Sequence, residues 1–179
     1  MNHPPVDDDG DGGSHESVFR YVVVNDHAGR FVTAAGWIDS PAGALTADLS
    51  LTGRAIFGFN SKYKKGAATP TGQTEFQFKV AHLNFRSTEY QWLVVAGARA
   101  QYKGTGTING AGNYAFKLTA IDEKLTPSTD TDLFRIKIWD QDIGDAETPG
   151  ALVYDNEPGV DDDSRPTTAI TKGSIVIHK

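Results

Sequence analysis

Strict alternation of apolar and polar residues is the feature that most constrains this chain. Apolar side chains occupy every second position in the runs 76–80, 114–118 and 134–138. A period of two places one face of a strand in a core and the other toward water, whereas a surface helix needs apolar residues three and four positions apart. No window of helical length shows that second pattern. The chain is therefore expected to be all-β.

Turn residues divide the chain into many short strands. Ala96-Gly97 and the segment 109–112 are typical of tight hairpins, and such short connections make consecutive strands antiparallel neighbours. The prediction is an antiparallel β-sandwich or flattened meander barrel of about ten strands, in which 18–179 form one domain and 1–17 an acidic, loosely ordered arm. Besides the three alternating runs, strands are expected at 18–24, 30–38, 51–60, 90–95, 98–103, 105–108, 151–154 and 173–178.

The same alternation predicts which side chains form the core. Tyr90 and Trp92 share a parity opposite to Gln91, so both are expected to face inward. A chain of 179 residues can bury roughly 70% of the surface that its unfolded form exposes, so it needs no disulfide or metal to build this core. The remaining expected core residues are Phe57, Phe59, Phe76, Phe78, Tyr114, Phe116, Phe134, Ile136 and Ile138.

Composition excludes several classes of function. The chain has no cysteine, which rules out thiolate zinc sites, iron–sulfur clusters and cysteine nucleophiles. Its net charge is −6 and its lysines are scattered apart from Lys62, Lys64 and Lys65, which argues against binding to nucleic acid. No apolar stretch approaches the roughly 20 residues of a membrane span, so none is expected.

Several stretches are similar to a domain type of exported bacterial proteins. The acidic run 7–13 followed by 18–24 resembles the last hairpin of a PKD-type immunoglobulin-like repeat, and residues 36–179 resemble the C-terminal all-β domain that follows such repeats in multidomain proteins. The resemblance implies an extracellular or cell-surface location, neighbouring domains of a larger protein, and no settled activity. The matching words are GWIDSPAG at 36–43, FGF at 57–59, SKYKKG at 61–66, TEFQF at 74–78, QYKG at 101–104, FRIKIWD at 134–140 and GSIVIHK at 173–179.

Two groups of aspartates are candidate calcium ligands. Asp7, Asp9 and Asp11, followed by Gly12, reproduce the opening of a D-x-D-x-D-G calcium loop, although the bidentate Glu expected at the twelfth place is replaced by Val18. The alternative is a solvated hairpin tip, in which aspartate and glycine simply favour a turn.

The second group follows the strand at 134–138. Asp140, Asp142 and Asp145 precede Asp155 and Asn156, and oxygen ligands of this kind suit Ca²⁺ and not zinc. The alternative here is a long polar hairpin loop.

Trp139 is the candidate ligand-binding residue. It shares parity with Arg135 and Lys137, which places it on the outer side of its strand. An exposed indole ring beside polar groups is suited to stacking on a sugar, so Trp139, Arg135 and Lys137 are predicted to bind a polysaccharide or cell-surface glycan. The alternative is that the ring covers the open end of the sandwich.

Enzyme signatures are weak. His82 precedes Ser87, but no G-x-S-x-G motif surrounds a serine and no H-E-x-x-H motif occurs. Glu75 and Glu89 are carboxylates of the kind that glycosidases pair, yet nothing in the sequence brings them together. The favoured interpretation is a calcium-stabilised, non-catalytic accessory module of an exported protein that binds a surface glycan or presents a larger protein. A hydrolase acting on a polysaccharide or ester, and a purely structural terminal domain, are the alternatives.

Calcium is predicted to stabilise the protein, because the clustered carboxylates would otherwise repel one another. A ligand present at 100 times its dissociation constant adds about 2.7 kcal/mol to the free energy of unfolding. Thermal melts in millimolar CaCl₂ and in EDTA should therefore differ by several degrees. Identical melting temperatures in CaCl₂ and in EDTA would contradict the prediction that calcium stabilises the protein.

Overall fold

The structure, a computed structural model, describes residues 29–126 and 131–179, and these residues form an antiparallel all-β fold, as the sequence predicts. Within them, nine strands make one sheet in the order β8-β7-β6-β5-β4-β3-β2-β1-β9. The predicted strand 18–24 and the arm 1–17 lie outside the described residues. The strands are β1 (Phe31–Ser40), β2 (Gly53–Lys62), β3 (Thr71–Phe78), β4 (Leu83–Ala96), β5 (Arg99–Ile108), β6 (Ala111–Ile121), β7 (Leu133–Asp140), β8 (Leu152–Asp155) and β9 (Lys172–His178), with short 3₁₀ turns η1 (Lys79–Ala81) and η2 (Glu123–Leu125).

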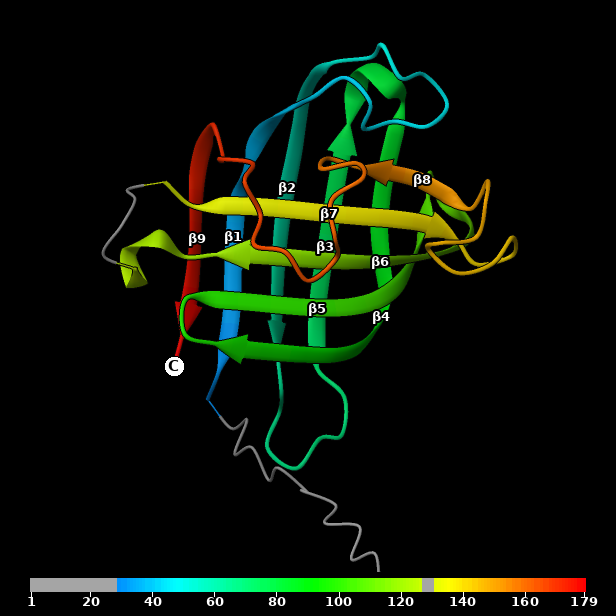
Figure 1. The fold of residues 1–179 in the computed structure, drawn as a ribbon. Coiled ribbons are helices and arrows are strands. Elements are labelled where there is room, and N and C mark those ends of the chain that lie inside the picture. Colours follow the sequence, from blue (N-terminus) through cyan, green and yellow to red (C-terminus); the bar gives the residue numbers. More distant parts are fainter. Residues whose placement is uncertain (1–28, 127–130) are drawn as a thin grey trace, which may run out of the picture.

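The sheet folds over itself into two crossed layers (Figure 1). Strands β9, β1, β2 and β3 make the back layer, β5, β6 and β7 cross in front of it, and β4 begins in the back layer and curves into the front one. Register shifts between Ser87 and Glu89 and between Tyr90 and Trp92 interrupt the pairing of β4 with β5 at this bend. Such bulges bend a strand and increase its twist, which lets one continuous sheet enclose a core.

Glycines in β5 allow that strand to follow β4 around the bend. A Cβ atom on Gly104 would lie 2.2 Å from the backbone oxygen of Glu89, and one on Gly106 would lie 2.3 Å from that of Arg86. Real Cβ atoms essentially never approach so closely. The G-T-G segment of β5 is therefore required by the close contact of two backbones at the corner of the fold.

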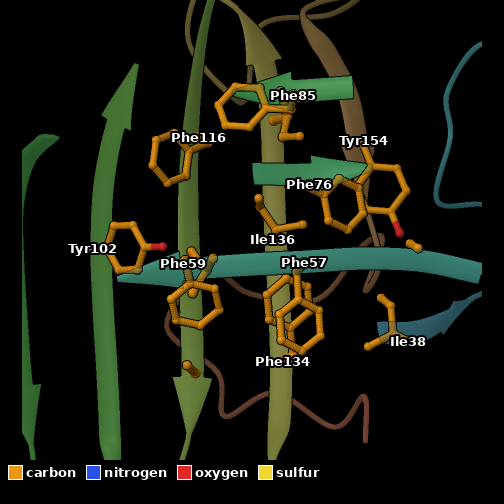
Figure 2. Close-up of a cluster of buried hydrophobic side chains, with 14 of the residues drawn as sticks. Ile38, Phe57, Phe59, Phe76, Phe85, Tyr102, Phe116, Phe134, Ile136 and Tyr154 are labelled. Atoms are coloured by element: carbon orange, nitrogen blue, oxygen red, sulfur yellow. The ribbon is translucent and has the colours of Figure 1, made fainter. Parts of the chain in front are cut away.

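The core lies between the two layers and is rich in aromatic side chains (Figure 2). The rings of Phe57 in the back layer and Phe134 in the front layer stack with centroids 4.3 Å apart. Eight of the nine side chains predicted from alternation, together with Tyr90, are buried, and the ninth, Tyr114, packs half-buried against them. This part of the prediction is confirmed.

Two inward-facing predictions are wrong, each because the strand geometry changes locally. Val80 continues the alternation of β3 in the sequence, but the strand ends at Phe78 and Val80 is 53% exposed in η1. Trp92 follows the bulge in β4, which reverses the parity after Tyr90. Leu93 takes the inward position, and the half-buried Trp92 pairs across the sheet with Lys103 on the outer face.

Both terminal strands of the sheet have partners on their outer edges. The carboxylates of Asp132 and Asp122 accept the backbone N–H groups of Ile175 and Ile177 in β9, at 2.7 and 3.0 Å. On β8, a segment of the β1–β2 loop pairs through Leu45 and Tyr154. Backbone groups that would otherwise recruit another strand are thus satisfied within the chain.

The described residues contain no helix that is long and apolar enough to cross a membrane.

We predict that Gly104→Ala destabilises the fold, because the added methyl group must push β5 away from β4. Overpacking of this kind typically costs about 1–3 kcal/mol, measurable by denaturant titration. The matched control is Gly58→Ala in β2, where an added Cβ has no neighbour within 4 Å. Equal effects of the two substitutions would contradict the proposed role of Gly104 at the corner.

Candidate functional site

Trp139, the predicted sugar platform, lies on the outer face of β7 but is covered. It is 5% exposed and packs in a small cluster with Ala115 and Ala151. The Lys103 ammonium group lies 5.4 Å from the centroid of the indole ring. The parity argument placed the residue on the correct face, but the expectation of an exposed ring is wrong, because the loop after β7 folds back over it.

Arg135 and Lys137 lie beside Trp139 and bind the chain's own carboxylates. Arg135 is buried and donates to both oxygens of Asp155, at 3.0 and 2.8 Å. Lys137 contacts Asp162 at 2.9 Å and Glu147 at 3.1 Å. Burial acts to lower the pKa of both cations, but the hydrogen bonds and Coulomb attraction of these acids outweigh it and raise the pKa of each.

The acidic segment 155–163 forms ion pairs with two of three lysines in a row on the front layer. Lys103, Lys117 and Lys137 are direct cross-strand partners on β5, β6 and β7, an arrangement in which like charges repel. Asp162 binds Lys137, and Asp163 lies 3.5 Å from Lys117. Asp162 and Asp163 therefore supply counter-charges to Lys137 and Lys117 on the outer face of the sheet.

The predicted calcium ligands of the second group are engaged in local turns. One oxygen of Asp140 accepts the backbone N–H of Asp142, and Asp142 accepts from the side chain of Asn113. Asp145 accepts from the Thr148 hydroxyl. No three acidic or histidine side chains in 29–126 and 131–179 gather in a way that could hold a metal ion. Asp7, Asp9 and Asp11 lie outside the described residues, and calcium binding stays a prediction.

The clearest open site is a hollow of about 610 Å³ on the outer face of the back layer, which the sequence analysis did not identify. On β2 and β3 its outward-facing lining residues alternate with the buried Phe57, Phe59 and Thr74, and β4 closes one side. At that side Ser87 accepts the backbone N–H of Thr74 at 2.8 Å, where β4 separates from β3. The lining residues are Ala34, Ile56, Phe57, Gly58, Phe59, Asn60, Gln73, Thr74, Glu75, Gln77, Arg86 and Ser87.

Strand register explains why this surface is hollow. Gly58 lies between Ala35 on β1 and Glu75 on β3, so at this point of the floor β2 contributes no side chain. On one side Ile56 pairs with Gln77, and on the other Asn60 pairs with Gln73. These larger side chains flank Gly58 along the strand. The hollow is therefore a groove with amide-bearing walls, hereafter the outer groove.

Charged groups are present at the outer groove but compensate one another. Arg86 Nη2 lies 3.4 Å from Glu75 Oε1, and their side chains are 66% and 40% exposed. Gln77 also donates to Glu75. An ion pair this exposed contributes little to stability, so both groups are available to a ligand.

The fold does not require a glycine at position 58. A Cβ atom there would have open space around it, and its backbone lies outside the left-handed region. Glycine within a strand costs about 0.5–1 kcal/mol relative to alanine. A glycine with this cost and without a packing reason is typical of a place where a ligand approaches the backbone.

An aromatic side chain extends one wall of the groove. Trp37 on β1 is the cross-strand partner of Ile56 and is half-buried. The guanidinium carbon of Arg54 lies 4.1 Å from the centroid of its ring. Unlike the covered Trp139, Trp37 is therefore partly exposed and lies beside a residue that lines the groove.

The parity of β2 and β3 was visible in the sequence, and it places Gln73, Glu75 and Gln77 on one outer face. Their meeting with Asn60 and Gly58 depends on register, which alternation alone does not provide. Glu89, the suggested catalytic partner of Glu75, is exposed opposite Thr105 and does not line the groove.

Comparison of the chain with protein-family models, curated proteins and solved structures gives no match.

We predict that Trp139→Ala destabilises the protein by roughly 3–5 kcal/mol, the range for emptying a buried aromatic site. Denaturant titration measures this loss, and the half-buried Trp92→Ala, also on the outer face, should cost less. If Trp139→Ala is the milder substitution, the ring is not the packed element described above.

Proposed function

We propose that this chain is a non-catalytic module that binds a glycan in the outer groove. Amide, carboxylate and guanidinium groups provide both donors and acceptors, as sugar hydroxyls require. The groove lies on the surface of the sheet and is not an enclosed cavity, which suits a segment of polymer better than a small molecule held in a pocket. Gly58 is the observation that carries the proposal, because it keeps the floor accessible at a cost that folding does not explain.

The alternatives have less support. A glycosidase needs two carboxylates across the scissile bond, whereas Glu75 is the one carboxylate among the residues that line the groove. A purely structural domain has no evident use for a polar hollow built on an unfilled glycine. We retain the proposal of an extracellular or cell-surface location within a larger exported protein, because it follows from the resemblance to domains that follow PKD-type repeats.

We predict that Gly58→Val separates binding from stability. The valine fills open space on a central strand and has the higher β-propensity, so the melting temperature should stay the same or rise. The same side chain occupies the groove floor, so retention on insoluble polysaccharides should fall sharply.

The matched control is Gln91→Val, which adds a branched side chain at an exposed β4 position outside the groove. It should retain wild-type binding. The proposal fails if no member of a broad glycan panel retains the wild-type protein, or if Gly58→Val binds as the wild type does.

A further inference from the structure

Basic side chains gather at the end of the back layer where β1 begins and β9 ends. Phe31 pairs across the sheet with Lys62 on one side and with His178 on the other, which brings three distant parts of the chain together. The rings of Phe31 and His178 stack with centroids 3.8 Å apart. We call this region the basic end, made of Arg30, Lys62, Lys64, Lys65, His178 and Lys179.

The cations of the basic end have no acidic partner among the described residues. No Asp or Glu occurs in the sequence at 27–38, 49–74 or 164–179. The ion pairs of 29–126 and 131–179 involve none of these side chains. By contrast, Lys117 and Lys137 of the front layer are paired with aspartates, and the whole chain has a net charge of −6.

The basic end continues the outer groove. Outward-facing positions alternate along β2, so Lys62 follows Asn60 and Gly58 on the same face. A ligand lying parallel to β2 would pass over the groove floor and then reach Lys62 and the loop that carries Lys64. From Ile56 to Lys62 this path covers roughly 20 Å, at about 3.3 Å per residue.

We infer that the ligand is an acidic polysaccharide, whose carboxylate or sulfate groups contact the basic end while its sugar rings occupy the outer groove. This inference rests on the proposed function and adds the charge of the glycan to it. Unpaired ammonium groups attract anions over a distance of about one Debye length, roughly 8 Å at physiological ionic strength. A neutral glycan would leave these cations without a role.

Binding should be measured by affinity electrophoresis and pull-down with two matched pairs of polymers. Dextran sulfate is compared with dextran, and polygalacturonate with its methyl ester, so that the sulfate and carboxylate sources are tested separately. Wild-type protein should prefer the acidic member of at least one pair. Lys62→Gln/Lys64→Gln should weaken that binding roughly tenfold, whereas Lys79→Gln/Lys124→Gln, with the same net charge, should not.

The Gly58→Val variant distinguishes failure of this inference from failure of the proposed function. If Gly58→Val abolishes binding while acidic and neutral polymers bind equally, the groove binds glycan and the acidic preference is wrong. If Gly58→Val binds acidic polymers as the wild type does, the lysines adsorb polyanions without the groove, and both proposals are overturned. If the two double lysine variants lose binding to acidic polymers equally, the preference depends on the net charge of the protein and not on the basic end. That result would also overturn the inference.

Discussion

The bend in β4 is the constraint on which the rest of this structure depends. One antiparallel sheet can enclose the Phe57–Phe134 core only if a strand passes from one layer into the other, and β4 does so through its two bulges. Two consequences follow directly from the bend. The β5 backbone must approach β4 closely, which requires Gly104, and β4 must separate from β3 beyond Arg86. The outer groove lies at that separation.

Charge compensation differs between the two layers. The front layer aligns three lysines and buries Arg135, and the acidic segment 155–163 forms ion pairs with Arg135, Lys117 and Lys137. A buried guanidinium with a bidentate carboxylate has its desolvation cost offset only by such complete pairing. Among residues 29–126 and 131–179, no acidic side chain forms an ion pair with Lys62 or Lys64 in the back layer. The inference of an acidic ligand rests on this difference between the two groups of cations.

Gly104 and Gly58 have different physical explanations. Packing within the fold requires Gly104, whereas we propose that ligand binding requires Gly58. Gly104 is surrounded by backbone and aromatic atoms, so a larger residue has no room. Gly58 is surrounded by open space, so a larger residue is compatible with the fold. The proposal of a glycan site rests on this asymmetry, because selection for stability alone would favour a β-branched residue on a central strand.

The sequence by itself determined the all-β class and the antiparallel pairing of strands joined by short turns. It also identified much of the aromatic part of the core, because the period-two pattern is a local property of each strand. It also placed Trp139 on the outer face. Only the tertiary structure decided that a loop buries this ring, that the bulge turns Trp92 outward, and that Asp155 and Asp162 form ion pairs with Arg135 and Lys137. These outcomes depend on register, bulges and loop placement, which arise from contacts between residues distant in the chain.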